Sequence, residues 1–535
     1  MASLVKAIEE HAASRAGATA CVIGPQRRSY GELGDQILRF ASALRQLGFR
    51  PGDRLSLYLP NGVEYVICFY GAMRAGLVAN LINGAFTRAE VHYLLSDSGA
   101  AGIVSTPELL ARIGIADEEP GAEQIGGGPA SRLRVVISTG SARPPWHSLA
   151  SLLASPPDPV PMPPDDAPAC LPYSSGTTGR SKGIVHTHDS LGMQAELSAN
   201  HLQLRADDVL VQALPLVHLY PGNIIMGGLF VAGATMVVQP AFDPPAFPAL
   251  LAGHHATACA GVPTTYAMLC QLPEEHTSGL DLGQLGIAFS AGAPLPGSIR
   301  SAFRSRFGAD VLNCYGITEA AGNLVANLRY GDRPDLSCGV PYPLTEVRIV
   351  DPEGSDVPAG GIGELIARGP QIMTGYWNRP DATRTTLADG WLHTGDLARQ
   401  DDRGFYFIVD RTKDLILCGG YNVYPAEVEE VLQSHPSVAM CAVFAVPDEI
   451  KGEKPWAAVV PGLGEQIDVA ALDSHCRESL ASYKVPRRFV VVDDLPRSSV
   501  GKILRRELRA RYAPEAQQPS AAAPAAAPAT AKENA

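Results

Sequence analysis

Short apolar segments alternate with longer helical patterns from residue 29 to residue 314, and this alternation constrains the fold more than any other feature. Helices are expected at 29–47, 63–75 and 88–96. Strands are expected at 52–59, 77–82, 101–105, 133–138, 170–173, 209–214, 235–239, 256–261, 287–290 and 311–314. Repeated strand-helix-strand units are typical of mainly parallel sheets covered by helices. The predicted fold class is therefore α/β.

The pattern of predicted strands and helices changes twice beyond this region. After Asp332, short alternating segments at 346–350, 363–367 and 404–409 suit a β-rich subdomain. After Val409, helical patterns at 427–433 and 469–480 surround strands at 438–446 and 456–460. We therefore expect three parts, which are a large N-terminal domain of residues 1–409, a small α+β domain of residues 410–512 and a disordered Ala/Pro-rich tail of residues 513–535.

Composition narrows the range of partners and locations. A net charge of -12 over 535 residues gives no electrostatic footprint for nucleic acid. The longest apolar stretches fall short of the ~20 residues that span a bilayer, and the acidic N-terminus predicts an amphipathic helix in place of a secretory signal. The 10 cysteines form no Cys-x-x-Cys pair, as expected for free thiols in a reducing compartment. These features predict a cytoplasmic protein without a membrane span.

Residues 173–183, Tyr-Ser-Ser-Gly-Thr-Thr-Gly-Arg-Ser-Lys-Gly, form a candidate phosphate-binding loop after the strand at 170–173. Glycines let backbone N–H groups converge on an anion, while Arg180 and Lys182 supply positive charge. The loop is not a Walker A motif, because Gly183 follows Lys182 where Ser or Thr is required. A flexible surface loop is the alternative interpretation.

Three further segments carry groups that suit a nucleotide or a transition state. In 313–319, Tyr315 can stack on adenine and Glu319 can ligate a divalent cation. Asp396, at the end of an apparent strand, can accept the hydroxyls of a ribose. Lys502, beside a glycine, can stabilise transition-state charge if a separate domain carries it into a site. Taken singly, each segment also fits a plainer interpretation, namely a buried tyrosine with an exposed glutamate, a turn aspartate and a solvated lysine.

In this order the motifs resemble those of the adenylate-forming (AMP-binding) superfamily, in its acyl- and aryl-CoA synthetase branch. The matching motifs are the loop 174–183, Tyr-Gly-Ile-Thr-Glu at 315–319, Thr-Gly-Asp at 394–396, Asp-Arg-x-Lys-Asp at 410–414, Gly-Gly-Tyr-Asn-Val-Tyr-Pro-x-Glu at 419–427, and Gly-Lys at 501–502. The resemblance extends to about Tyr512. It implies that a carboxylic acid and ATP form acyl-AMP and pyrophosphate, after which the thiol of coenzyme A takes the acyl group.

The resemblance also implies roles for individual residues of the N-terminal domain. The β- and γ-phosphates of ATP are expected against Ser174, Ser175, Gly176, Thr177, Thr178, Gly179 and Lys182. Mg²⁺ is expected between Thr177 and Glu319. The residues expected to line the adenine or to lie beside it are Gly292, Ala293, Pro294, Asn313, Tyr315, Gly316 and Thr318. The ribose is expected at Asp396, with Arg411 nearby.

In the C-terminal domain the resemblance implies a movement between the two half-reactions. Lys413 matches the hinge, and Lys502 is expected to bridge the acyl carboxylate and the α-phosphate during adenylation. After rotation, Gly419, Gly420 and Tyr421 are expected to line a tunnel for the pantetheine arm of CoA. The plainer interpretation of 419–421 is a surface loop at a helix start.

His218 matches a position that CoA ligases of this family place near the acyl carboxylate, and the catalytic set is expected to be Lys502, His218, Glu319 and Thr177. A core histidine is the alternative interpretation. No aspartate lies in 218–222, so an amino acid substrate is not expected. Ser181, Gly84 and Val500 depart from frequent family residues, but none of these changes removes a charged catalytic group.

Two questions remain open from the sequence. The acid is either aryl or aliphatic, with its pocket shaped by Thr265, Gly292, Ile317 and 217–222. The acceptor is CoA or, alternatively, the pantetheine of a carrier protein. A non-catalytic nucleotide-binding protein is the third possibility, but it leaves Lys413, Lys502 and His218 without a role.

Overall fold

The computed structural model describes residues 4–115, 133–142, 145–174, 181–448, 450–462, 464–497 and 503–516, in a chain that divides into two compact units. Of the described residues, the first unit contains those up to Thr412 together with Arg497, and the second contains Lys413–Pro496 and the residues from Ile503. The structural division therefore follows Thr412, close to the boundary expected at Val409. No helix among the described residues combines the length and the apolar character needed to cross a membrane.

The first unit contains a nine-stranded sheet that is parallel in its centre. In spatial order its strands are β17 (Val340–Pro341), β16 (Gly322–Ala326), β15 (Asp310–Ile317), β14 (Ile287–Ser290), β13 (Ala258–Gly261), β11 (Val209–Gln212), β12 (Thr235–Val238), β1 (Thr19–Ile23) and β2 (Gln26–Ser29). The pairs from β15 to β1 are parallel, and the outer pairs are antiparallel. This confirms the mainly parallel sheet that the alternation predicts.

A second nine-stranded sheet lies in the same unit. Its strands are β20 (Gly375–Tyr376), β10 (Lys182–Thr187), β8 (Pro168–Leu171), β4 (Val78–Ile82), β3 (Arg54–Tyr58), β5 (Gly102–Ser105), β6 (Val135–Ser138) and β7 (His147–Ser148), with β9 (Tyr173–Ser174) paired to β10. From β8 to β7 every pair is parallel, whereas β10 runs antiparallel to its neighbours.

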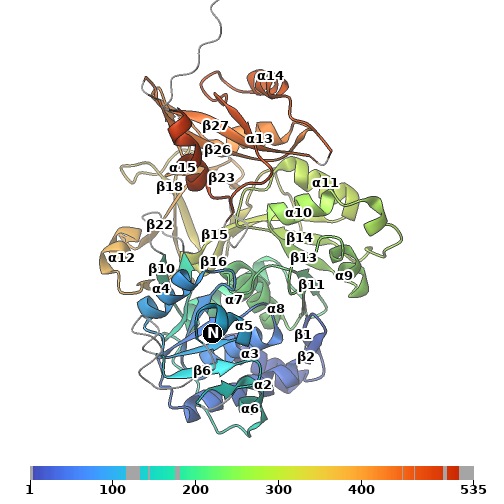
Figure 1. The fold of residues 1–535 in the computed structure, drawn as a ribbon, viewed down its shortest axis with the longest axis vertical. Coiled ribbons are helices and arrows are strands. Elements are labelled where there is room, and N and C mark those ends of the chain that lie inside the picture. The colour runs from blue at the N-terminus through green and yellow to red at the C-terminus, as the bar shows by residue number, and fades with distance from the viewer. Residues whose placement is uncertain are drawn as a thin grey trace, which may run out of the picture. The chain divides into compact units, whose positions relative to one another are not determined.

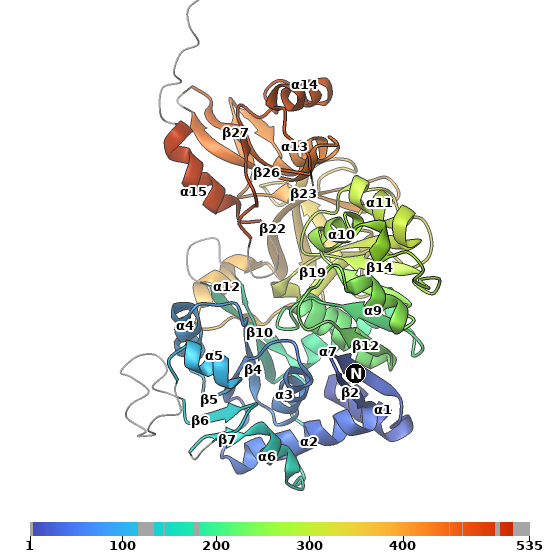
Figure 2. The same cartoon turned by 45° about the vertical axis from the view of Figure 1, so that its right-hand side comes forward.

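Alternate residues of each strand pack on opposite faces, as the pleat of a strand requires. In the first sheet, Val211 and Val237 face a core formed with α9 (Phe247–Gly253), α10 (Pro263–Cys270) and α11 (Gly297–Phe307), and Figure 1 shows these helices beside β13 and β14. Leu210 and Met236 face a second core that also includes Leu55 of the other sheet. That shared core contains α1 (Leu4–Ser14), α2 (Tyr30–Gln46), α3 (Val63–Arg74), α7 (His188–His201) and α8 (Met226–Ala232), with α2 beside α6 (Leu149–Ala154) in Figure 2.

Helix α2 shows why the predicted helices form where they do. Ser29 caps its first turn by accepting a hydrogen bond from the backbone N–H of Glu32, and the Glu32 carboxylate accepts one from the Ser29 N–H at 2.7 Å. This reciprocal capping box satisfies two N–H groups that the helix itself leaves without partners. The helix predicted for 29–47 is thereby confirmed.

The β-rich subdomain is an antiparallel sheet of β18 (Glu346–Val350), β19 (Gly363–Arg368), β22 (Trp391–Gln400), β21 (Leu387–Ala388) and β23 (Tyr406–Arg411). Asp396 lies inside β22, so the expectation that it ends a strand is wrong. The register explains the difference, because β22 passes from His393 to Leu397 while β19 passes only from Ile366 to Glu364. The segment 394–396 is therefore a bulge, which redirects Asp396 while the strand continues.

The second unit contains helices and a mainly antiparallel sheet, in agreement with the predicted α+β class. Its sheet contains β24 (Ile416–Cys418), β25 (Tyr421–Val423), β26 (Val438–Asp448), β27 (Gly452–Pro461) and β28 (Phe489–Val491). Cys441 and Val443 pack with α13 (Pro425–Gln433) and α14 (Val469–Ser479), whereas Ala442 and Phe444 pack with Leu508 of α15 (Arg505–Ala516). Because α15 continues to Ala516, the tail expected from residue 513 begins inside a helix, and residues 517–535 lie outside the described residues.

Candidate active site

The two ends of the candidate phosphate loop form a short antiparallel ladder. Ser174 of β9 pairs with Lys182 of β10, and Tyr173 pairs with Gly183. This pairing holds the two stems of the loop together at the edge of the second sheet. The predicted binding residues Ser175, Gly176, Thr177, Thr178 and Gly179 lie outside the described residues, so the predicted roles of these five residues remain predictions.

Helix α4 (Arg88–Ser98) anchors both stems of this loop. The Tyr93 hydroxyl donates a hydrogen bond to the Ser181 carbonyl oxygen at 2.7 Å, and the Tyr173 hydroxyl donates one to Asp97 Oδ2 at 2.9 Å. Tyr93 and Asp97 are one helical turn apart, so they project from the same face of α4. Arg379 donates to the other Asp97 oxygen at 2.7 Å. The helix therefore holds the loop stems at two fixed points.

Lys182 and Glu319 both contact Tyr376 of β20. The Lys182 Nζ lies 4.9 Å from the centre of the Tyr376 ring, within the range of a cation–π interaction. The Tyr376 hydroxyl donates to Glu319 Oε1 at 2.8 Å. Burial, and then the Glu319 charge, raise the pKa of Tyr376, which keeps the phenol protonated as a donor. The Lys182 ammonium group and the Glu319 carboxylate are thus brought to one aromatic ring.

Glu319 lies in the short 3₁₀ helix Thr318–Ala320, directly after β15. Tyr376 binds one carboxylate oxygen, and no residue in the described part of the chain makes a hydrogen bond to Oε2, so that oxygen can bind a cation. Mg²⁺ in nucleotide sites is commonly held by one or two carboxylates together with phosphate oxygens and water, so this side chain fits such an ion. Among the described residues, no group of three or more His, Cys, Asp or Glu side chains is arranged to hold a metal by itself.

Asp396 is a buried carboxylate with a donor on each oxygen. The Tyr315 hydroxyl donates to Oδ2 and Arg411 Nε donates to Oδ1, each at 2.7 Å, and Asp396 is 3% exposed. Arg411 is the direct cross-strand partner of Asp396 in the pair β22–β23. Burial raises the pKa of Tyr315 well above its ordinary value, with the Asp396 charge as the next cause. The sequence-predicted ribose and adenine residues therefore form one network.

The candidate adenine residues come from two neighbouring parallel strands. Ser290 of β14 pairs with Asn313 of β15, and Gly292, Ala293 and Pro294 follow directly after β14. Gly316 lies within β15, which extends to Ile317 and so beyond the strand predicted for 311–314, and Thr318 follows directly after the strand. Ligand sites of α/β sheets lie beyond the carboxyl ends of such strands. The fold thus brings these two predicted segments together.

Hydrogen bonds hold the side-chain nitrogen and the backbone carbonyl of Asn313, but not its side-chain oxygen. Its Nδ2 donates to Cys338 Sγ at 3.3 Å, and its carbonyl oxygen accepts from Asn327. The buried Oδ1 has no hydrogen-bond partner within the part of the chain that the structure describes. An unpaired buried oxygen is costly, so it indicates an acceptor that a ligand N–H can satisfy.

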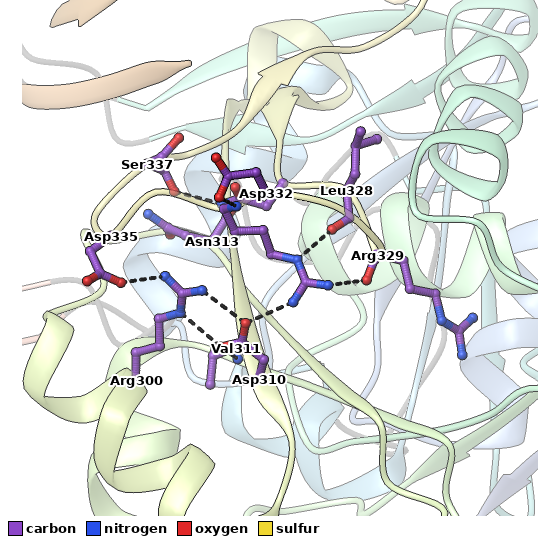
Figure 3. Close-up of polar contacts among 11 residues, drawn as sticks. Arg300, Asp310, Val311, Asn313, Leu328, Arg329, Asp332, Asp335 and Ser337 are labelled. Carbon is purple, nitrogen blue, oxygen red and sulfur yellow. Dashed lines mark hydrogen bonds and ion pairs between the residues drawn. The ribbon is translucent and has the colours of Figure 1, made fainter. Parts of the chain in front are cut away.

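Charged side chains hold the connection between β16 and β17 against the start of β15 (Figure 3). Arg300 donates to both Asp310 oxygens at 2.9 Å and to Asp335 at 3.0 Å. Arg333 donates to Asp310 Oδ2 at 2.8 Å. Asp310 begins β15, the strand that carries Asn313 and Tyr315. This network therefore holds the base of the candidate adenine site.

His218 lies in a tightly wound segment that leads into the π-helix Tyr220–Ile225. The Gly222 N–H donates to the His218 carbonyl oxygen at 2.8 Å, and a Cβ on Gly222 would lie 2.2 Å from the Leu216 carbonyl oxygen. Only glycine fits at that position. The ring Nε2 of His218 is 3.0 Å from Asn83 Nδ2. Burial lowers the pKa of His218 to about 4, so the ring is neutral at neutral pH.

In the second unit, Gly419 and Gly420 form the turn between β24 and β25. Both have positive φ angles, 60° and 84°, as a two-residue type I′ hairpin turn requires. Tyr421 is 60% exposed and its ring stacks on Tyr483 with 4.8 Å between ring centres. The segment is therefore a hairpin tip that precedes α13 rather than an irregular loop. Lys413 is the first residue of this unit, and Lys502 lies outside the described residues.

Known proteins resemble this chain over almost its whole length. Residues 8–377 match the family model of the AMP-binding enzymes, and residues 427–502 match that of the AMP-binding enzyme C-terminal domain. A feruloyl-CoA synthase of Amycolatopsis sp is 37% identical over 496 residues, covering 92% of this chain and 96% of the relative. A long-chain-fatty-acid–CoA ligase of Yersinia pestis is 34% identical, covering 95% and 94%.

The chain belongs to the AMP-binding enzyme family.

A solved structure agrees with this assignment. The anthranilate CoA ligase AuaEII in complex with anthranoyl-AMP matches with a TM-score of 0.89 and 29% sequence identity, covering 97% of this chain and 98% of that one. The match covers residues of both units. The expected α/β fold class with a small α+β domain is thereby confirmed.

Several residues of this AMP-binding enzyme were not predicted from its sequence. They are Asn83, Tyr93, Asp97 and Tyr376, and each contacts a predicted site residue or its immediate neighbour. The i, i+4 spacing of Tyr93 and Asp97 places both on one helix face, but nothing in that spacing indicates what they contact. Tyr376 lies far from Glu319 along the chain, so only the fold reveals their contact.

Proposed function

We propose that this protein is an ATP-dependent carboxylic acid:CoA ligase that forms acyl-AMP and pyrophosphate, and then acyl-CoA and AMP. The observation that carries the proposal is the convergence of Lys182 and Glu319 on Tyr376. A cation for phosphate oxygens and a carboxylate for Mg²⁺ at one place suit a bound nucleoside triphosphate. The relatives named above, which are CoA synthases and ligases for aromatic and fatty acids, support the same reaction.

In the first half-reaction, an oxygen of the acid's carboxylate attacks the α-phosphorus of ATP. A new bond joins that oxygen to phosphorus, and the bond from the α-phosphorus to the bridging oxygen of pyrophosphate breaks. Positioning and charge neutralisation dominate catalysis of phosphorus transfer. Lys182 is suited to neutralise phosphate charge, and Glu319, with Thr177 from the loop, would hold the Mg²⁺ that shields the leaving pyrophosphate.

The nucleoside part of ATP fits the network at β15 and β22. The unpartnered Asn313 Oδ1 can accept an N–H of adenine. Asp396 has lone pairs left after binding Tyr315 and Arg411, and these can accept ribose hydroxyls. We therefore assign the base to Asn313, Tyr315 and the 292–294 turn, and the ribose to Asp396 with Arg411.

In the second half-reaction, the thiolate of CoA attacks the acyl carbonyl carbon of acyl-AMP. A carbon–sulfur bond forms, and AMP leaves with the electron pair of the broken carbon–oxygen bond. The glycine hairpin 419–420 and Tyr421 are the proposed contacts for the pantetheine arm, with Lys413 as the hinge of the second unit. Lys502 is the proposed partner of the acyl carboxylate and α-phosphate in the first half-reaction.

The acid itself is aryl or aliphatic, and His218 is proposed to contact its carboxylate. Pyrophosphate release should be measured across benzoates, cinnamates and fatty acids, each with and without CoA. The proposal expects acid-dependent pyrophosphate release and a CoA thioester identified by mass spectrometry. Transfer only to a carrier-protein pantetheine would favour the alternative acceptor, while magnesium-ATP binding without any acid-dependent pyrophosphate would support a non-catalytic nucleotide-binding protein.

A further inference from the structure

The orientation of the Asn83 side-chain amide is fixed by its own backbone. Asn83 follows directly after β4 and is 6% exposed. The Ala85 N–H donates to Asn83 Oδ1 at 2.8 Å, in the turn that Asn side chains commonly make two residues ahead. Because an N–H group can only donate, the atom that it contacts must be the amide oxygen. The amide nitrogen therefore occupies the other position.

That nitrogen determines where the proton of His218 is located. Asn83 Nδ2 lies 3.0 Å from His218 Nε2, and an amide NH₂ group only donates. His218 Nε2 must therefore accept, so the single proton of the neutral ring is on Nδ1. Burial, the cause that lowers the pKa of His218 to about 4, excludes the doubly protonated ring at neutral pH.

The segment that carries His218 is held independently of its ring. Asn61 donates to the Leu214 carbonyl oxygen at 3.0 Å and accepts from the Leu216 N–H at 2.9 Å. The Tyr65 hydroxyl donates to the Leu216 carbonyl oxygen at 3.0 Å. Loss of the Asn83 contact would thus alter the ring while leaving these backbone anchors in place.

The remaining ring nitrogen is available to a ligand. Within the described part of the chain, no residue makes a hydrogen bond to His218 Nδ1, whereas Nε2 is bound to Asn83. A carboxylate only accepts hydrogen bonds, so it can be bound by an Nδ1–H but is repelled by a nitrogen lone pair. The two tautomers of His218 therefore differ in their ability to bind an acid.

We propose that Asn83 is a positioning residue for substrate activation, which holds His218 in the Nδ1–H tautomer so that the ring donates a hydrogen bond to the acid's carboxylate. This inference rests on the proposed function and deepens it by naming the residue that sets the protonation of the acid-binding group. Asn83 itself need not touch the substrate. Its effect is transmitted through the ring that it orients.

The test variant is Asn83→Asp, which keeps an oxygen for the Ala85 N–H but replaces the donor facing His218 with an acceptor. Asn80→Asp is the matched control, because Asn80 is buried on β4, the strand that Asn83 follows, and its Nδ2 donates to the hydroxyls of Ser56 and Ser98. The acid used is the one that turns over fastest in the panel above. We expect Asn83→Asp to raise the KM for that acid by about 10-fold or more, with a smaller change in the KM for ATP. Asn80→Asp should leave both the KM for the acid and the KM for ATP close to their wild-type values.

A spectroscopic measurement on the unmodified protein tests the tautomer directly. With ¹⁵N-labelled histidine, and His218→Ala to assign the signal, Nδ1 should carry the proton and Nε2 should not. In Asn83→Asp the Nε2 should become protonated. A wild-type ring protonated on Nε2, or an unchanged acid KM in a folded Asn83→Asp protein, would overturn the inference. If the wild-type protein activates no acid at all, the proposed function fails, while the ring signal still decides the tautomer.

Discussion

At the scale of single residues, Tyr376 has two separable functions. Its ring face contacts the Lys182 ammonium group, and its hydroxyl binds the Glu319 carboxylate. Phenylalanine keeps the ring and loses the hydroxyl, whereas leucine loses both. The two contacts can therefore be removed in sequence.

Tyr376→Phe should raise the KM for magnesium-ATP by about 10-fold, because a hydrogen bond to a charged group contributes about 1.5–3 kcal/mol. Tyr376→Leu should have a larger effect, since Lys182 also loses its aromatic contact. Steady-state kinetics at several Mg²⁺ concentrations would measure both effects. Tyr330→Phe is the control, because Tyr330 is 52% exposed. Equal kinetics for Tyr376→Phe and the wild type would remove Tyr376 from the site.

The sequence predicts residues of this site where a chemical motif is continuous along the chain. Asp396, Tyr315 and Lys182 were all named from such motifs, and their contacts agree with a common nucleotide site. Asn83 and Tyr376 were not named, because a lone Asn or Tyr in sequence carries no information about a partner more than fifty residues away. Their roles depend on how distant strands meet.

At the scale of elements, α4 connects the phosphate loop to the segment around Arg379. Asp97 accepts hydrogen bonds from Tyr173 and Arg379 with different oxygens. An asparagine at this position offers only one oxygen, so it cannot satisfy both donors in the same way. The stems of the loop should then lose one of their two attachments to the helix.

We therefore expect Asp97→Asn to raise the KM for ATP several-fold and to speed backbone hydrogen exchange at the ends of the loop, near residues 173 and 182. Hydrogen-exchange mass spectrometry with ATP kinetics would measure both. Asp381→Asn, which alters an exposed pair with Arg384, provides the control. Unchanged exchange at the loop stems would show that α4 does not restrain them.

The elements themselves are largely predictable, because long helices and buried strands leave periodic apolar patterns. The structure differs from the predicted elements where the apolar pattern is weak. The two-residue strands β7, β9, β17, β20 and β21 are too short for a pattern, and the bulge at 394–396 depends on pairing with β19. Helix α15 continues past the expected boundary to Ala516 although Pro514 lies in this stretch, so composition alone misplaces the helix end.

At the scale of the whole molecule, buried histidines link stability to pH. Burial lowers the pKa values of His186, His188 and His218 to about 4. An unfolded chain, with histidine near pKa 6.5, therefore binds more protons than the folded protein between pH 6.5 and 4. The folded state must lose stability as the pH falls through this window.

Chemical denaturation at pH 7.5 and pH 5 should show a lower free energy of unfolding at pH 5. Below pH 4 each of these histidines can contribute a loss of up to about 3 kcal/mol, at 1.36 kcal/mol per pKa unit. His188→Gln should make the free energy of unfolding depend less steeply on pH, because both His188 ring nitrogens are buried without a partner among the described residues. A stability that is flat from pH 7.5 to pH 5 would contradict this prediction.

The role proposed for Lys502 leads to a prediction about the two half-reactions. If Lys502 acts only in adenylation, Lys502→Ala should lose on the order of 10²- to 10³-fold in acyl-AMP formation. Thioester formation from supplied acyl-AMP should survive. Single-turnover assays of each half-reaction would measure this, and an equal loss in both would refute a role of Lys502 in adenylation alone.

The paired donors on Asp396 have a consequence for nucleotide choice. A carboxylate that is already oriented by Tyr315 and Arg411 cannot turn away when a sugar offers one hydroxyl fewer. With a deoxyribonucleotide, a lone pair on a 3% exposed side chain would stay without a donor and without water to replace it. If Asp396 binds the ribose as proposed, we expect deoxy-ATP to be a poorer substrate than ATP.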